Sequence, residues 1–401
     1  MTAAIEAAAH PADAATVMRL FPTRPRLLAL GEPTHGEDTL LALRNDLFRE
    51  LVEQQGYRTI TIESDCLKGF VVDDYLTSGT GTPDEVMAEG FSHGWGGLAG
   101  NRELVRWMRA YNADRPGPEQ LRFAGFDGPL EMTAAASPRQ ALTALHDYLA
   151  HRIDPHLLPG TGQALDRLGA DDRWTDPDAM MDPDRSVGQT PAARELRRVA
   201  DELAALLDTQ LPQLISVSSA DELGRARLYA RTATGLLRYH FWMADTSPSR
   251  MTRLCALRDQ MMADNLLALA ARGPVLVYAH NSHLQRDKSS MQLWEGPVEW
   301  WGAGALVAAH LGAEYAFVAT ALGTIRHQGV DTPPPDTLEG FLYELPQDRS
   351  LIDTRSLVEI LGPSQPAPRV SPWFGYAPLD PARLAGSDGI VFVKDLQQSQ
   401  H

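Results

Sequence analysis

Cysteines, signal sequences and long apolar runs are scarce or missing in this chain. Its 401 residues include two cysteines, Cys66 and Cys255, which are too few for a disulfide framework and form no CxxC pair for zinc or redox chemistry. The first residues carry no basic region followed by an apolar run, so we expect no signal peptide. No apolar run approaches the ~18 residues that indicate a membrane span. These absences favour a cytoplasmic enzyme or binding protein with no membrane partner.

Positive charge is scarce as well, with 36 Lys and Arg against 52 Asp and Glu and a formal net charge of -16. A nucleic-acid-binding protein shows a basic stripe, so the composition argues against that class. The signatures H-E-x-x-H, Walker A and G-x-G-x-x-G are also absent, and the single G-x-S-x-G match, at 90–94, follows no predicted strand and so is not a nucleophile elbow. A standard serine hydrolase, a common zinc protease, a P-loop NTPase and a Rossmann dehydrogenase are therefore disfavoured. The charge is compatible with an enzyme whose small-molecule substrate is neutral or cationic.

The order of strand and helix signals predicts an α/β fold. Apolar runs typical of buried strands alternate with apolar residues at helical spacing. The strands are expected at 26–32, 58–64, 121–127, 274–280 and 314–322, and the helices at 40–55, 67–78 and 102–112. We therefore expect a mainly parallel central sheet that is flanked by helices.

Residues 137–271 interrupt this alternation. Apolar residues recur there every three or four positions with few strand signals, which predicts a large helical insertion or subdomain. We accordingly divide the chain into 1–136, the first part of the α/β core, 137–271, the helical insertion, and 272–401, the second part of the core with a C-terminal tail. The Asp- and Pro-rich segment 170–191 is expected to be a loop or lid.

Four of the predicted strands end in an ionisable side chain. These strand ends are Glu32, Glu63, Asp127 and His280. Ligands of open parallel sheets bind at the carboxyl ends of the strands, so the four side chains are expected to converge on one crevice. We therefore place the candidate site there and count Asp127 among the substrate-binding residues.

Three histidines near these strand ends are candidates for proton transfer. His35 lies in the loop GEPTHG after the first strand, and His280 and His283 lie in AHNSH after a later strand. Histidine is the usual general base near neutral pH. A helix-capping or solvated histidine is the alternative for each of them. Asn281, between the last two, is a candidate for substrate binding.

Arg44 is expected to be buried on the helix that follows the first strand. On a helical wheel of about 100° per residue, the apolar side chains of 40–52 point on average almost at Arg44. Removing one partner of a buried ion pair costs about 3–5 kcal/mol, so the guanidinium needs a partner. The nearest carboxylates are Glu32 and Glu63, and the pair belongs either to the site or to the structural core alone.

Aromatic side chains near the same motifs are candidates for a pocket wall. Trp294, Trp300 and Trp301 are expected in a loop after the histidine pair, and Trp95 lies in the glycine-rich segment 91–101. We count Trp95, Trp294 and Trp301 among the substrate-binding candidates, with ordinary core positions as the alternative.

The segment GEPTHGEDTLLALRNDLFRELVEQQGYRTITIESD resembles the opening signature of the erythromycin esterase family. That signature has a Gly-Glu-x-Ser/Thr-His-Gly loop, an Arg on the following helix and a Glu that ends the next strand. The likeness continues in order through GFSHGWGGLAGNRELVRWMRAYN, LRFAGFD, RDQMMADN at 258–265 and VYAHNSHLQRD. It covers nearly the whole core and fades in the helical insertion and the C-terminal tail.

The resemblance implies an α/β hydrolase with helical additions that needs no metal. In the family the loop His activates water against a macrolactone ester. The family residues are matched here by His35 for the loop His, Glu32 for the loop Glu, Arg44 for the helix Arg, Glu63 for the strand-end Glu, and His280 and His283 for the downstream His-Asn-x-His. Two departures are Pro33, which stiffens the loop, and GWGGLAG, whose glycines alter the pocket shape.

The leading hypothesis is hydrolysis of an ester without a cofactor. His35, oriented by Glu32 or Glu63, would take a proton from water, and Arg44, His280 or His283 would stabilise the oxyanion or protonate the leaving alkoxide. One alternative is a biosynthetic enzyme that uses the same residues for cyclisation, elimination or group transfer. Others are a metal-dependent hydrolase in which Glu37 joins the histidines, and a binding protein without catalytic activity.

Overall fold

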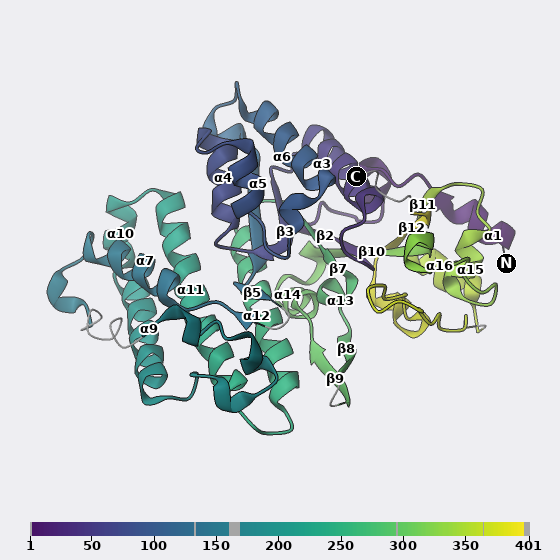
Figure 1. The fold of residues 1–401 in the computed structure, drawn as a ribbon. Coiled ribbons are helices and arrows are strands. Elements are labelled where there is room, and N and C mark those ends of the chain that lie inside the picture. Colours follow the sequence, from purple (N-terminus) through teal and green to yellow (C-terminus); the bar gives the residue numbers. More distant parts are fainter. Residues whose placement is uncertain (1, 132–133, 160–168, 294–295, 364, 397–401) are drawn as a thin grey trace.

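The computed structural model describes residues 2–131, 134–159, 169–293, 296–363 and 365–396. Within these residues the centre is an eight-stranded sheet in the order β1-β11-β12-β10-β2-β7-β3-β4 (Figure 1). The six strands from β12 to β4 are parallel, and β11 and β1 add antiparallel strands at one edge. The predicted α/β fold with a mainly parallel sheet is confirmed. The strands are β1 (Ala9–His10), β2 (Leu27–Glu32), β3 (Thr59–Asp65), β4 (Arg122–Asp127), β7 (Val275–His280), β10 (Tyr315–Thr324), β11 (Arg349–Asp353) and β12 (Gly389–Asp395).

Two helical layers cover the sheet, because successive side chains of a strand point to opposite faces. Leu28 and Leu30 of β2 pack with the helices between Ala14 and Asn112, whereas Leu27 and Ala29 pack with a second group of helices. Burial on both faces explains why the strands read as continuous apolar runs. The first layer comprises α2 (Ala14–Arg19), α3 (Asp38–Gln55), α4 (Gly69–Ser78), α5 (Pro83–Glu89) and α6 (Ala99–Asn112), and the second α12 (Arg250–Ala270), α13 (Asn281–Leu284) and α14 (Ala303–Leu311).

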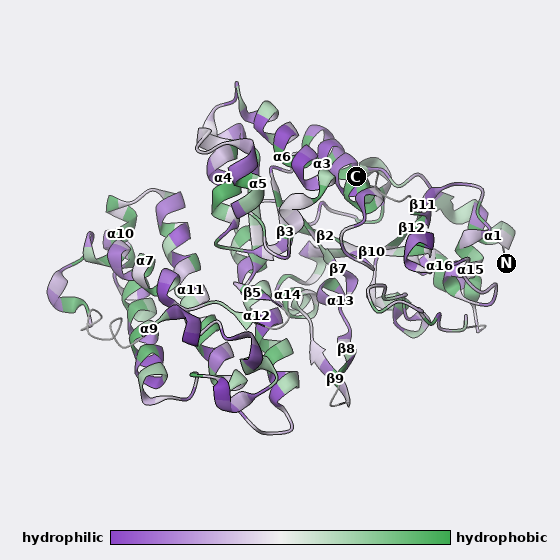
Figure 2. Cartoon of the chain, viewed as in Figure 1, coloured by the Kyte–Doolittle hydropathy of each residue, from purple (hydrophilic) through white to green (hydrophobic). Residues whose placement is uncertain are grey.

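The predicted helical insertion consists of amphipathic helices that pack on one another. Figure 2 shows hydrophilic and hydrophobic residues alternating along them. Their apolar faces form one cluster that also contains Cys66 and Leu67, which follow β3, so this part packs directly on the core. The segment 170–191 forms short 3-10 turns, and its Trp174 lies edge-on to His240. The helices are α7 (Arg139–Ala150), α9 (Pro191–Thr209), α10 (Leu211–Val217) and α11 (Ala220–Met243).

The segment after the histidine pair differs from the sequence-based expectation. Trp300 and Trp301 lie not in a loop but in an antiparallel ribbon of β8 (Lys288–Leu293) and β9 (Gly296–Trp301). The ribbon pairs only with itself and is largely exposed, so β8 lacks the apolar run that marked the buried strands. Trp294 lies outside the described residues.

The C-terminal part completes the sheet and supports the first loop. Strand β12 pairs with β10, while α1 (Thr2–Ala8), α15 (Leu338–Tyr343) and α16 (Thr354–Leu361) surround this edge. The Ala377 N–H donates to the Pro33 carbonyl over 2.9 Å. None of the helices in the described ranges is long and apolar enough to cross a membrane.

Asn112 gives a test of how the first helical layer is attached to the sheet. It is buried at the end of α6, donates to the carbonyls of Leu76 and Leu121, and accepts from the Leu121 N–H. We expect Asn112→Ala to lower the free energy of unfolding by about 2–4 kcal/mol, because buried backbone groups lose their partners. Urea unfolding measures this, with exposed Gln54→Ala as the control. Equal stability of the two variants would contradict this role.

Candidate active site

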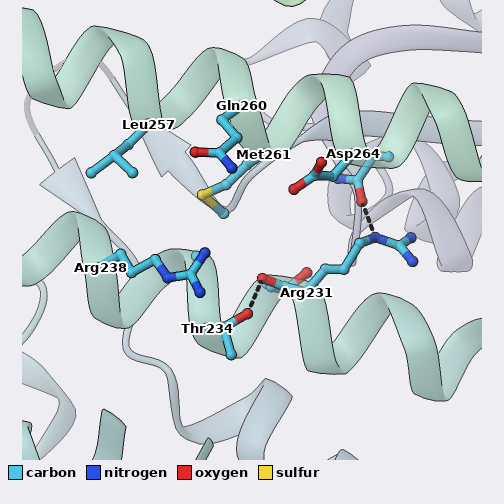
Figure 3. Close-up of a pocket in the computed structure, with 10 residues that line it drawn as sticks. Arg231, Thr234, Arg238, Leu257, Gln260, Met261 and Asp264 are labelled. Atoms are coloured by element: carbon cyan, nitrogen blue, oxygen red, sulfur yellow. Dashed lines mark hydrogen bonds between the residues drawn. The ribbon is translucent and has the colours of Figure 1, made fainter. Parts of the chain in front are cut away.

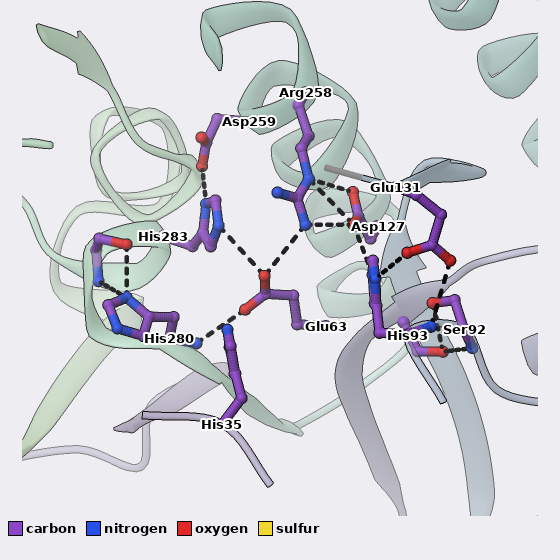
Figure 4. A network of polar contacts seen from close by, with 12 residues as sticks. His35, Glu63, Ser92, His93, Asp127, Glu131, Arg258, Asp259, His280 and His283 are labelled. Carbon is purple, nitrogen blue, oxygen red and sulfur yellow. Dashed lines mark hydrogen bonds and ion pairs between the residues drawn. The ribbon is translucent and has the colours of Figure 1, made fainter. Parts of the chain in front are cut away.

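The four ionisable strand ends lie on four neighbouring strands. Glu32, His280 and Asp127 end β2, β7 and β4, and Glu63 lies two residues before the end of β3; the strands are adjacent in the order β2, β7, β3, β4. Strand β7 pairs between β2 and β3, so Glu32 stands in register with His280. The sheet therefore brings the predicted residues to one edge, and Figure 4 shows how Glu63, Asp127 and the backbone of His280 are joined to Arg258 of α12 by polar contacts.

His35 and Glu32 form a hydrogen-bonded dyad. The ring Nδ1 of His35 lies 2.7 Å from Glu32 Oε1, whereas no bond joins His35 to Glu63. Glu32 is buried, but 40% of the His35 side chain is exposed. An ionised carboxylate only accepts, so Nδ1 carries the proton and Nε2 is left with a lone pair. Burial lowers the pKa of His35, but the charges of Glu63 and Glu32 raise it by more, and the net shift is upward.

Arg44 supports this dyad from behind. As predicted, the side chain is buried, with 1% exposure. Its hydrogen bonds go to Asn45 Oδ1, and no carboxylate oxygen of the described residues lies within the 4 Å of an ion pair. The expected pairing with Glu32 or Glu63 is therefore wrong. The guanidinium lies instead 5.0 Å from the ring centre of Tyr278, and the Tyr278 hydroxyl donates to Glu32 Oε2.

Glu63 is the centre of a buried charge network. Its Oε1 is 3.2 Å from Arg258 Nη2 and 3.3 Å from His283 Nε2, and its Oε2 accepts from the His280 N–H over 2.9 Å. Burial raises the pKa of Glu63, but the charges of His283, His35 and Arg258 outweigh burial, and the pKa lies well below the ordinary value. Glu63 is thus a fixed anion and a poor base.

His280 and His283 have opposite protonation, although they lie three residues apart. Burial and the charge of His35 lower the pKa of His280 to about 3, and its Nδ1 accepts from the Ser282 N–H. The ring is therefore neutral, with its proton on Nε2. Burial alone would lower the pKa of His283, but Asp259 and Glu63 on its two nitrogens raise it to about 10. His283 is an imidazolium near neutral pH.

Arg258 connects Glu63 to Asp127. Its Nε and Nη2 both bind the Asp127 carboxylate, with a shortest distance of 2.7 Å. On the far side of Asp127, His93 Nε2 lies 3.6 Å away, and His93 Nδ1 pairs with Glu131. Asp127, expected among the substrate-binding residues, is fully buried and enclosed by these two side chains.

Sequence reasoning assigned no role to Arg258, Asp259 or His93. Asp259 accepts from His283, from Trp300 Nε1 and from the Ala303 N–H, and so fixes the charged imidazole. The adjacent charges that open RDQMMADN on α12 were the available signal. His93 has a φ of 56°, the one positive φ of a non-glycine residue in the described ranges, and such strain often marks a functional position.

The remaining candidates for substrate binding differ in how deeply their side chains are buried. Asn281 is buried and uses its amide to bridge Thr320 of β10, so it holds the sheet together. Trp95, on the short turn Trp95–Gly97, lies between two imidazoles, with its ring 5.3 Å from those of His35 and His93. Trp301 is 52% exposed on the outer side of β9.

The hypothesis of a metal-dependent hydrolase needs Glu37 and the histidines to lie together as metal ligands. Glu37 does not join the histidines of the network, because its Oε1 binds His327 Nε2 at 3.0 Å. In the part of the chain that the structure describes, no three His, Cys, Asp or Glu side chains are grouped to hold a metal ion.

The buried His283 cation predicts a pH dependence of stability. Its pKa is near 10 in the folded state and about 6.5 in an unfolded chain, so its contribution is complete below pH 6.5 and is lost as the pH rises toward 10. We expect the wild type to lose stability between pH 7 and 9.5 by on the order of 2 kcal/mol more than His283→Gln. Urea unfolding at both pH values measures the difference. Parallel losses would show that His283 is not protonated.

Comparisons with known proteins place the chain in a family. The erythromycin esterase family model matches residues 52–395. Erythromycin esterase type II of Escherichia coli is 24% identical over 328 residues, which are 79% of this chain and 73% of that protein. A solved succinoglycan biosynthesis protein aligns with a TM-score of 0.71 at 17% identity, over 98% of this chain and 96% of that one. A variant of the erythromycin esterase EreC in its open conformation aligns with a TM-score of 0.68 at 18% identity, over 96% and 94%.

The structural alignments show that the fold is shared, and the family model covers most of the chain. Together with the ordered motifs, this match establishes that the chain belongs to the erythromycin esterase family of hydrolases.

Proposed function

We propose that the protein hydrolyses an ester and that His35 is the general base. The observation that carries this is the His35–Glu32 dyad, with Nδ1 held at 2.7 Å and the ring partly exposed. His35 Nε2 takes a proton from water, and the resulting hydroxide attacks the ester carbonyl. The imidazolium then returns the proton to the leaving alkoxide, so one side chain serves both steps.

The surrounding charges support this proton transfer. Glu32 fixes the tautomer of His35, and Tyr278 and Arg44 fix Glu32. The developing imidazolium is stabilised by Glu32 and by the more distant charge of Glu63. Arg44 is a positioning residue in this scheme because Tyr278 separates it from the dyad.

Among the three side chains considered for the oxyanion, His280 is the best supported. Both nitrogens of His283 face carboxylates, and Arg44 is buried behind Tyr278. His280 is neutral, with its ring centre 5.3 Å from that of His35. A neutral imidazole whose Nε2–H turns from the Pro33 carbonyl to the developing charge is a suitable donor, and such a donor contributes about 10²–10³ in rate.

A macrolactone ester is the proposed substrate class. A relative of 24% identity is named an erythromycin esterase, and the His35–Glu32 dyad provides a base without any cofactor step. Mass spectrometry of erythromycin after incubation with the protein tests this class. A gain of one water is the expected result, with or without a chelator. A gain of mass that disappears when the chelator is added would favour a metal-dependent reaction. An unchanged mass without the chelator would favour a biosynthetic enzyme with another substrate.

His35→Ala tests the base. We expect the rate of ester hydrolysis to fall roughly 10²–10⁴-fold, because the water loses its proton acceptor. The exposed His156, on the turn Pro155–Leu157 of the helical part, provides the matched control, and His156→Ala should keep full activity. Circular dichroism establishes that both variants are folded. Full activity of folded His35→Ala would remove the assignment.

Glu32→Gln tests the dyad through the pH profile. Gln can still accept the Nδ1 proton but removes a charge that raises the pKa of His35. The base must be deprotonated, so kcat/KM of the wild type should fall as the pH drops through a value above 6.5. In Glu32→Gln this inflection should move to lower pH. Glu53→Gln, at an exposed position of α3, should leave it in place. An unshifted inflection in Glu32→Gln would contradict the coupling.

A further inference from the structure

A cavity lies away from the polar network, between the core and the helical part. It has a volume of about 700 Å³ and is bounded by β4 and α4 on one side and by α11 and α12 on the other. We call it the α11 groove. It contains none of the side chains of the His35–Glu63 network. Cavities of roughly 300–1,000 Å³ are typical of small-molecule sites.

The charge of this groove is opposite to that of the chain. The protein carries -16 overall, yet six arginines and only two aspartates line the groove, a surplus of four positive charges. The aspartates are Asp73 and Asp221, and the arginines are Arg58, Arg122, Arg225, Arg227, Arg231 and Arg272.

The carboxylates near the groove are already bound. Asp73 and Asp221 both bind Arg122, at 2.7 and 3.0 Å. Arg225 pairs with Asp74. The charges of Arg122 and Arg225 are therefore balanced without a ligand.

In the part of the chain that the structure describes, four arginines of the groove have no carboxylate of their own: Arg58, which binds the carbonyls of Val52 and Tyr57, and Arg227, Arg231 and Arg272. Within the described residues, no carboxylate lies within 4 Å of Arg227 or Arg231, and Arg231 Nε instead bonds the neutral Asn265 at 3.1 Å. Arg272 is 3.7 Å from Asp221, which already binds Arg122.

The guanidinium groups of Arg227, Arg231 and Arg272 lie together at one face of α11, although Arg272 comes from the segment after α12. Residues 224, 227 and 231 are three and seven positions apart and lie on the same side of a helix. Arg272 rests on Gly224, where an added Cβ would lie 1.7 Å from its Nη2. Burial and the charges of Arg272 and Arg227 lower the pKa of Arg231, although Cys66 and Asp264 act in the opposite direction. Mutually repelling cations in a half-buried groove are what a bound anion would stabilise.

Figure 3 shows Arg231 on α11 facing Asp264 on α12, beside a cavity of about 50 Å³. This smaller cavity shares Arg231 with the groove, but it is too small for more than a few water-sized groups. Arg238, two turns further along α11, lines only the smaller cavity.

We propose that the α11 groove binds a small organic phosphate, with its phosphate groups at Arg227, Arg231 and Arg272. The planar guanidinium fork matches the geometry of phosphate oxygens, which favours phosphate over a single point anion. Leu228 and Leu269 line the same groove and provide apolar surface for the organic part. The volume accommodates a nucleotide-sized molecule.

Calorimetric titration at low ionic strength with ADP and with inorganic pyrophosphate tests this site. Both should bind the wild type, and ADP should bind more tightly because of the apolar lining. Arg231→Gln and Arg227→Gln should each weaken binding at least about tenfold, because each removes charge-assisted hydrogen bonds. Arg238→Gln, on the same helix but outside the groove, is the matched control and should bind like the wild type.

Arg227 is exposed and makes no hydrogen bond or ion pair in the described ranges, so Arg227→Gln should fold even if Arg231→Gln does not. Citrate, a carboxylate of similar charge, should bind more weakly than pyrophosphate. Three results would each overturn the proposal: no binding of either phosphate by the wild type, equal weakening in Arg238→Gln and Arg227→Gln, or binding of citrate as tight as that of pyrophosphate.

Discussion

The buried carboxylate of Glu63 is the group on which the arrangement of the site depends. Burying a charge is costly unless cations and hydrogen-bond donors surround it. Arg258, His283 and the His280 N–H supply them, and each comes from a different segment of the chain. Arg258 must in turn bind Asp127, and His283 must bind Asp259. Three carboxylates thus share two cations, and the surplus of negative charge is the electrostatic environment in which the exposed ring of His35 becomes more basic.

The same network separates two histidines that look alike in the sequence. His280 ends β7 and His283 lies three residues later, and both lie near Glu63, but only His283 places its ring nitrogens against two carboxylates. His280 turns its Nδ1 to a backbone N–H instead, and that donor favours the neutral ring. The groups that each ring contacts, rather than the position of the histidine in the sequence, decide which imidazole is a fixed cation and which is a neutral donor.

Sequence patterns predicted the positions at the strand ends but not their pairing. Glu32, Glu63, Asp127 and His280 were accessible because each ends an apolar run. That β7 pairs between β2 and β3 was not accessible, since this contact joins segments more than two hundred positions apart in a chain with no repeat. The burial of Arg44 followed from helical periodicity, but its neighbour Tyr278 comes from that same distant strand. Arg258 and Asp259 looked like ordinary helix charges, because their partners become visible only after the sheet has brought three strands together.

The loop that carries His35 is held by the C-terminal part of the chain. Pro33 has no N–H, so its carbonyl is its only backbone hydrogen-bonding group, and that carbonyl accepts from Ala377. At the other end of the loop Glu37 is bound by His327, on the turn Arg326–Gln328 that follows β10. The position of His35 is therefore set from both sides by residues that take no part in the charge network. A change in either contact can move the base relative to Glu63 and to a bound ester, while every ion pair around Glu63 stays intact.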